Sequence, residues 1–118
     1  MAEVIDRLPP GSTAIHGGTP GLDTMAGEMA LDRGLTVEEY AADWQRFGPA
    51  AGPRRNVEMV TKSRPDVAFA FPLGVSRGTQ HCVYVLLAAR VPMATYTTWR
   101  DWPASVGRLL STLTSPPT

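Results

Sequence analysis

One continuous apolar run that ends in a glycine-containing turn constrains the fold of this chain more than any other feature. Residues 67–71 are all apolar, and the turn that follows them contains Gly74 and Gly78. A helix predicted over residues 79–90 comes next. An unbroken apolar run is typical of a strand that is covered on both faces of a parallel sheet. A strand, a glycine turn and a helix N-terminus in this order commonly hold a phosphate, because the N–H groups of the first helical turn and the helix dipole face the anion.

A second glycine loop lies upstream, at residues 16–21, between a short predicted strand and an apolar stripe with helical spacing. The alternation of strands and helices predicts the α/β class, a Rossmann-like three-layer sandwich with a mainly parallel sheet of about four strands. The predicted strands are 13–16, 36–40, 66–71 and 92–96, and the predicted helices lie between 21 and 34, at 53–63, at 79–90 and around 103–113.

Both glycine loops follow strands directly, so we expect them at the same edge of the sheet, where open parallel sheets bind ligands. Two such loops on one short chain point to a nucleotide-type ligand. The alternative is that the glycines only form tight turns. The candidate ligand contacts from the loops are Gly17, Gly18, Gly21, Gly74, Gly78 and Thr79.

Further candidates lie in and after residues 41–53, a segment that glycines and prolines predict to be irregular. Trp44 could stack on a nucleobase or anchor the loop, and Asp43 could bind a ribose hydroxyl or cap the loop. Arg54 and Arg55 open the next predicted helix, where a guanidinium could grip a phosphate with two parallel hydrogen bonds.

Composition limits the classes of function. The chain has 118 residues, enough for one domain, and its 11 basic residues balance 11 acidic ones. That balance argues against broad binding of nucleic acid, which needs a basic face. A single cysteine, Cys82, and two histidines argue against a disulfide framework and against a zinc site, and no cofactor is predicted. Cys82 itself is expected in the core. No apolar run reaches the roughly 18 residues of a membrane span, and the first residues are mixed and charged, so we expect a cytoplasmic protein.

Taken together, four motifs resemble the SLOG superfamily, the Rossmann-like group named for the Smf/DprA proteins and the LOG enzymes. The nearest branch is the YspA-like family of bacterial and phage proteins of unknown function. Its pattern reads H-G-G-x-x-G-x-D, A-D-W, A-G-x-x-R-N-x-x-M and A-F-P-x-G-x-x-x-G-T. The corresponding segments of this chain are residues 16–23, 42–44, 51–59 and 70–79.

The resemblance implies a domain that binds a nucleotide or a nucleotide-derived ligand, in the manner of a sensor rather than an enzyme. Arg55 and Asn56 fill the R-N of the pattern, so Arg55 is the better candidate for neutralising phosphate charge. Asn56 and Asp43 would contact the sugar or the base. The second glycine loop and Thr79 would supply backbone N–H groups to a phosphate.

One departure concerns the beginning of the domain. Related domains usually start with a strand, whereas this chain opens in the helix that follows it, at residues 2–8. We therefore expect a shortened domain over residues 1–96 and a C-terminal extension over 97–118 with a short helix. A missing central strand would expose apolar sheet edge. The expected remedy is a homo-oligomer, or cover from the tail that carries Trp99 and Trp102.

The other departure concerns catalysis. LOG enzymes, which cleave nucleoside 5′-monophosphates at the glycosidic bond, carry P-G-G-x-G-T-x-x-E, and Cys82 stands where that glutamate would be. This counts against a phosphoribohydrolase, although Arg55 with an acid from elsewhere, such as Asp43, remains an alternative. A third interpretation is a protein-interaction module with a degenerate ligand site, encoded by a phage.

Overall fold

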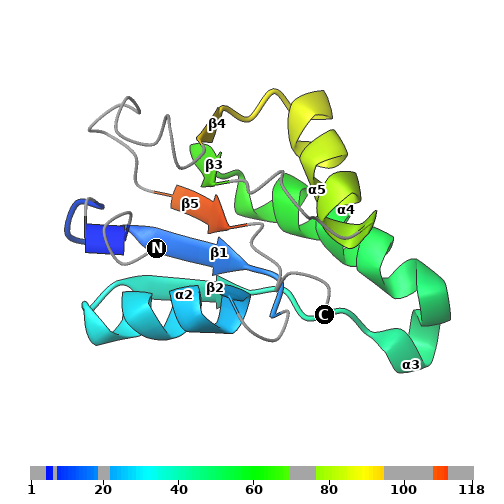
Figure 1. Cartoon of the computed structure of the whole chain (residues 1–118), viewed down its shortest axis with the longest axis horizontal. Coiled ribbons are helices and arrows are strands. Elements are labelled where there is room, and N and C mark those ends of the chain that lie inside the picture. The colour runs from blue at the N-terminus through cyan, green and yellow to red at the C-terminus, as the bar shows by residue number, and fades with distance from the viewer. Residues whose placement is uncertain (1–4, 7, 19–21, 70–76, 95–107, 112–118) are drawn as a thin grey trace.

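The computed structural model describes residues 5–6, 8–18, 22–69, 77–94 and 108–111, which contain a five-stranded sheet (Figure 1). The strand order is β2-β1-β5-β3-β4, and every pairing is parallel. The α/β class and the parallel sheet predicted from the sequence are thereby confirmed, with one strand more than expected. The strands are β1 (Thr13–His16), β2 (Thr36–Glu39), β3 (Val67–Phe69), β4 (Met93–Ala94) and β5 (Arg108–Ser111).

Three of the helices lie where the apolar spacing predicts them. They are α2 (Leu22–Asp32), α4 (Ala51–Ser63) and α5 (Arg77–Ala88). The prediction that residues 41–53 are irregular is wrong in part, because α3 (Trp44–Phe47) and a 3₁₀ turn (Gly48–Ala50) lead directly into α4. Such short helical turns bury too little surface to leave a periodic apolar pattern. Within the described ranges, every helix is too short or too polar to cross a bilayer.

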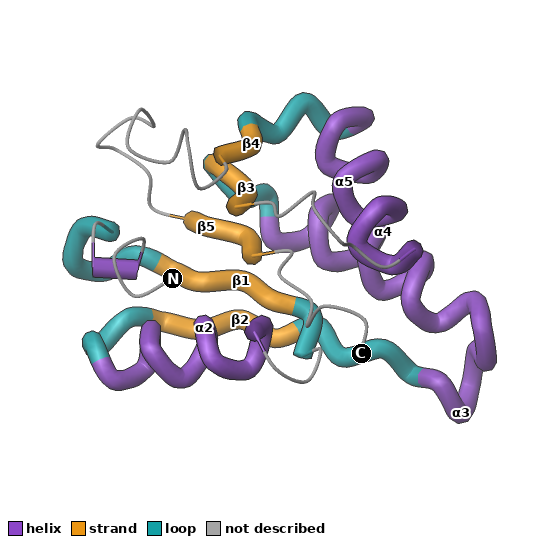
Figure 2. Tube along the Cα trace, viewed as in Figure 1, coloured by secondary structure: helices purple, strands orange, loops and turns teal. Residues whose placement is uncertain are grey.

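Strand residues alternate between two cores, one on each face of the sheet. Ala14, Phe69 and Leu109 pack with Ile5 and Ala30 of the N-terminal and α2 layer. Their neighbours along the strands point to the opposite face, since successive side chains of a strand alternate. That second core comprises Ile15, Met59, Val60, Ala68, Cys82, Leu86 and Leu110. The predicted three-layer sandwich is confirmed, with α2 on one face and α4 and α5 on the other (Figure 2).

The C-terminal strand β5 occupies the centre of the sheet, between β1 and β3. Leu109 and Leu110 are almost completely buried there, one in each core. The helix predicted around residues 103–113 is therefore wrong over Arg108–Ser111. The open edge expected from a missing strand is also wrong, because β5 fills the gap between β1 and β3. Of the two remedies expected, cover from the tail is present; Trp99 and Trp102 lie outside the described residues.

Arg108 anchors this strand to its surroundings. Its Nη2 lies 2.7 Å from Oε2 of Glu38 on β2, and its Nε donates to the carbonyl of Ser63 at 2.7 Å. Its backbone N–H donates to Oδ2 of Asp66 at 3.0 Å. One side chain thus joins β5, β2 and the end of α4.

Candidate functional site

The candidate site lies where the order of the strands changes direction. From β1 the chain proceeds outward to β2, whereas from β3 it proceeds to β4 at the other side of the sheet. Parallel α/β sheets bind ligands at such a switch point, beyond the carboxyl ends of the strands. Here those ends are His16 of β1, Phe69 of β3 and, between them, Ser111 of β5.

His16 shapes the first glycine loop. It is 7 % exposed, and its Nδ1 accepts a hydrogen bond from the backbone N–H of Gly18 at 3.0 Å. The other ring nitrogen, Nε2, faces Gly27 of α2, where an added Cβ would lie only 2.7 Å away. Burial lowers the pKa of His16 from its ordinary 6.5, and the charge of Glu39 offsets part of that effect. The imidazole is therefore neutral at neutral pH and serves as an acceptor that orients the loop.

Gly17 and Gly18 are explained by side chains of this chain that approach them. A Cβ on Gly17 would collide with the guanidinium of Arg55, with Cζ at 2.8 Å. Gly18 has φ +71°, in the left-handed region that favours glycine, and a Cβ there would collide with the carboxylate of Glu39. The two glycines therefore leave room for the side chains of Arg55 and Glu39 to pack against the loop.

Arg55 is held against that loop from two sides. Its Nη1 donates to the carbonyl oxygen of Gly17 at 2.5 Å, and its Nε donates to Oδ1 of Asn56 at 2.8 Å. The remaining nitrogen, Nη2, has no hydrogen-bond partner among the residues described. A guanidinium with two fixed donors and one open donor pair is prepared to bind an anion without losing side-chain freedom.

Asn56 continues the connection to α5. It is 2 % exposed, and its Nδ2 lies 3.2 Å from Nδ1 of His81. His81 is one helical turn inside α5, which begins at Arg77. The chain of contacts Gly17–Arg55–Asn56–His81 therefore joins the first glycine loop to the first turns of the second candidate phosphate-binding element.

Asp43 and Trp44 lie at α3, on the approach to α4. Oδ1 of Asp43 accepts a hydrogen bond from the backbone N–H of Arg46 at 3.1 Å, so it is the N-cap of α3. Trp44 is 59 % exposed, and its ring lies over Gly52, where a Cβ would be 3.3 Å from Cη2. The capping alternative explains Asp43 fully, whereas the exposed ring of Trp44 retains a free face.

Of the remaining predicted ligand contacts, two belong to the described residues and two do not. Gly78 and Thr79 belong to the first turn of α5, where backbone N–H groups have no partner within the helix; their contact with a phosphate stays a prediction. Gly21 and Gly74 lie outside the described residues. Within the ranges described, His, Cys, Asp and Glu form no group able to hold a metal ion.

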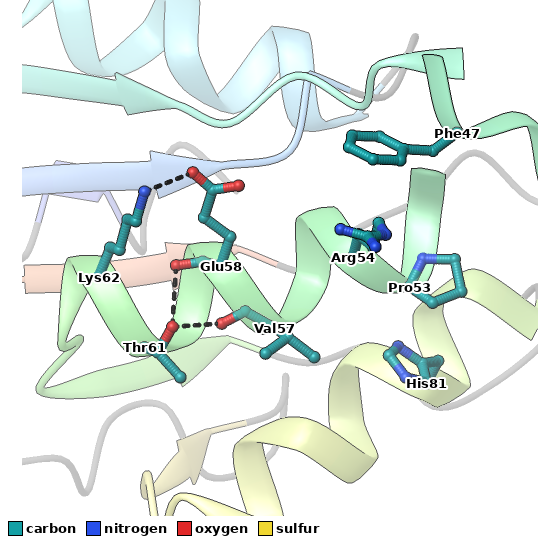
Figure 3. Close-up of a pocket in the computed structure, with 8 residues that line it drawn as sticks. All are labelled: Phe47, Pro53, Arg54, Val57, Glu58, Thr61, Lys62 and His81. Atoms are coloured by element: carbon teal, nitrogen blue, oxygen red, sulfur yellow. Dashed lines mark hydrogen bonds and ion pairs between the residues drawn. The ribbon is translucent and has the colours of Figure 1, made fainter. Parts of the chain in front are cut away.

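Arg54 has a different environment from its neighbour. Its guanidinium lies 4.2 Å from the centre of the Phe47 ring, a cation–π contact, on the outer side of α4. It lines a groove of about 610 Å³, where Phe47 and His81 stand on opposite sides with Arg54 between them (Figure 3). The two adjacent arginines are thus separated: Arg55 faces the glycine loop and Arg54 faces this groove.

Sequence reasoning missed the contributions of Glu39 and His81. Glu39 ends β2 at the same sheet edge as the glycine loop, which is the signal that could have indicated it. His81 follows the G-T pair of the second loop by two residues, within reach of the motif. Both residues were overlooked because their role depends on contacts with elements distant in sequence.

Comparison with known proteins places the chain in a family. The sequence model of the family described as "YspA, cpYpsA-related SLOG family" matches residues 1–47. The "Gene 61 protein" of Mycobacterium phage D29 is 38 % identical over 101 residues, which cover 81 % of this chain and 80 % of the phage protein. The chain belongs to the YspA, cpYpsA-related SLOG family. No solved structure matches this SLOG protein. The family match includes the first glycine loop, and Arg55 and Asn56 lie beyond it.

Proposed function

We propose that this SLOG protein binds a nucleotide or a nucleotide-derived ligand at the carboxyl edge of its sheet, in the manner of a sensor. The observation that carries the proposal is the position of Arg55, which Gly17 and Asn56 fix while its Nη2 finds no hydrogen-bond partner in the described part of the chain. An arginine that served only as a surface charge would not need a glycine beneath it, whereas Arg55 lies so close to residue 17 that only glycine fits there.

The ligand's phosphate would lie between Arg55 and the first turn of α5. The contact between Asn56 and His81 keeps α4 and α5 together at this end. The unpaired N–H groups of a first helical turn carry partial positive charge, which adds to the charge of the guanidinium. The exposed ring of Trp44 is the aromatic surface available to stack on a base.

Isothermal titration calorimetry with AMP and with adenosine tests the proposal, after native mass spectrometry has shown any ligand retained on purification. Arg55→Ala should weaken AMP binding by roughly 1.5–3 kcal/mol, or about 10-fold to 150-fold, the scale of a charge-assisted hydrogen bond. Lysine at this position should restore only part of the affinity because the planar fork is lost.

Arg54→Ala is the matched control, because it removes the same charge from the adjacent position on α4 but faces Phe47. It should leave AMP affinity nearly unchanged. Adenosine, which has no phosphate, should bind wild type and Arg55→Ala equally. An equal loss in both arginine variants, or no loss in Arg55→Ala, would remove Arg55 from the site.

A nucleoside-monophosphate hydrolase is the second candidate, and the carboxylate of Glu39 beside Gly18 is the observation that favours it. Glycosidic cleavage needs a carboxylate to stabilise a cation-like sugar or to activate water. Cys82, in the place of the LOG glutamate, is 4 % exposed, and Asp43 caps α3. We expect no release of free base from AMP; base release that Glu39→Gln abolishes would establish the hydrolase.

A further inference from the structure

Although the net charge of this chain is zero, its acidic and basic residues are unevenly distributed along the sequence. Residues 1–43 carry eight of the 11 acidic and two of the 11 basic residues, whereas residues 44–90 carry two acidic and seven basic ones. The first segment includes α2 and the second includes α4 and α5, which cover opposite faces of the sheet (Figure 2). The helices on the two faces differ in charge: α2 carries three acidic residues and no basic one, whereas α4, α5 and the residues that end them, Arg64 and Arg90, carry six basic residues and one acidic one. These two layers are called the acidic face and the basic face below.

An apolar side chain projects from the acidic face. Leu31 of α2 is 62 % exposed, and it is flanked by Glu28, three residues earlier, and by Asp32. Both carboxylates are exposed. Arg33 next to Asp32 forms its ion pair with Asp6 and interacts with Asp32 only through the charge. The opposite side of the same helix is buried through Ala26 and Ala30. This projection, Leu31 with its two carboxylates, is called the acidic knob below.

A groove of about 350 Å³ lies on the basic face, between the C-terminal ends of α4 and α5. Val60, Pro65, Ala89 and Val91 are among the apolar residues that line it, with Arg64 and Arg90. Both arginines are exposed, and no acidic partner is found for either in the described part of the chain. This basic groove has an apolar lining and two arginines without an acidic partner among the described residues, the complement of the acidic knob.

We propose that the acidic knob of one copy of this protein inserts into the basic groove of a second copy. Leu31 would fill the apolar lining while Glu28 and Asp32 approach Arg64 and Arg90. The molecule measures 38 × 30 × 25 Å, so either face can supply the roughly 800 Å² per partner of a standard interface. A nucleic acid on the basic face would pair the arginines but leave Leu31 and its carboxylates exposed, whereas a second copy covers both surfaces.

The contact joins two different surfaces, so it is heterologous rather than two-fold symmetric. Each bound copy still presents one free knob or one free groove. Association should therefore continue beyond a dimer, to a closed ring or an open filament, as concentration rises. The contact lies away from Arg55 and the glycine loop, so it does not depend on the proposed ligand.

Sedimentation velocity over a range of protein concentrations tests this contact, with two charge-reversed variants. The knob variant is Glu28→Lys with Asp32→Lys, and the groove variant is Arg64→Glu with Arg90→Glu. Wild type should associate, more weakly at about 0.5 M than at about 0.05 M NaCl, because the salt screens exposed charges. Each variant alone should associate about 100-fold more weakly, because like charges then face each other.

An equal mixture of the two variants should restore association, because the intact groove of one meets the intact knob of the other. Circular dichroism confirms that each variant is folded, and Gln45→Lys, an added charge on α3 outside both surfaces, should associate as wild type does. Three results would overturn the proposal: a wild type that stays monomeric, a knob variant that still dimerises, or a mixture that fails to associate. Binding of an oligonucleotide that only the groove variant loses, with wild type monomeric, would assign the basic face to nucleic acid instead.

Discussion

Replacing Gly17 by alanine should disturb the candidate site far more than the fold. The new Cβ would overlap the guanidinium of Arg55, whose Cζ would be 2.8 Å away. Arg55 is a flexible side chain and can swing out, so the backbone need not move. The swing breaks two hydrogen bonds, Nη1 to Gly17 and Nε to Asn56.

The size of the effect follows from those two bonds. Hydrogen bonds from a charged group contribute about 1.5–3 kcal/mol each, and a half-buried arginine warrants about half of that, so their loss costs about 1.5–3 kcal/mol. Gly17 does not have a positive φ, so alanine also gains about 0.4–1 kcal/mol by restricting the unfolded chain. The free energy of unfolding should fall by about 0.5–2.5 kcal/mol, and AMP affinity should fall as in Arg55→Ala.

A double-mutant cycle measured by urea denaturation provides the decisive comparison. In the Arg55→Ala background the collision is absent, so Gly17→Ala should become neutral or stabilising by up to about 1 kcal/mol. Gly18→Ala is the contrasting variant, because its φ of +71° makes alanine unfavourable whether or not Glu39 is present. If Gly17→Ala costs the same with and without Arg55, the close approach of Arg55 does not explain this glycine.

Two further predictions concern stability. Because the pKa of His16 is lowered in the folded chain, the unfolded chain takes up the proton first as pH falls, so the contribution of His16 to stability should be complete above pH 6.5 and should be lost below it. His16→Asn keeps an acceptor for Gly18 and should reduce the change in melting temperature between about pH 7 and pH 5; an unchanged pH dependence would refute this. Arg108→Ala should lower the free energy of unfolding by about 1–2 kcal/mol, because the partly buried contacts of Arg108 with Glu38 and Ser63 hold β5 in the sheet. Lys62→Ala, which removes the exposed ion pair with Glu58, is the control; equal urea midpoints for the two variants would contradict the anchoring role of Arg108.

The candidate site could be predicted in part from the sequence. Motif register favoured Arg55 over Arg54 as the ligand contact, which stays a prediction; the structure shows that Arg55 faces the first glycine loop and Arg54 faces Phe47. The reason for the glycines could not be predicted. Gly17 and Gly18 leave room for Arg55 and Glu39, and those partners are 38 and 21 residues away along the chain. Nothing in a glycine motif states which side chain will approach it.

By itself, the sequence determined the class of the fold and most of its elements. Apolar runs and helical spacing are local signals, so β1, β2, β3, α2, α4 and α5 were predictable, and so was the position of Gly17 and Gly18 at the carboxyl end of β1. Only the tertiary structure decided the position of β5. The apolar residues of Arg108–Ser111 fit the helix predicted around 103–113 as well as they fit a strand, and the free energy of burying them as a strand exists only between β1 and β3. The difference in charge between the helices is likewise invisible in a net charge of zero, and it separates acidic from basic residues only because the sheet places α2 on one face and α4 with α5 on the other.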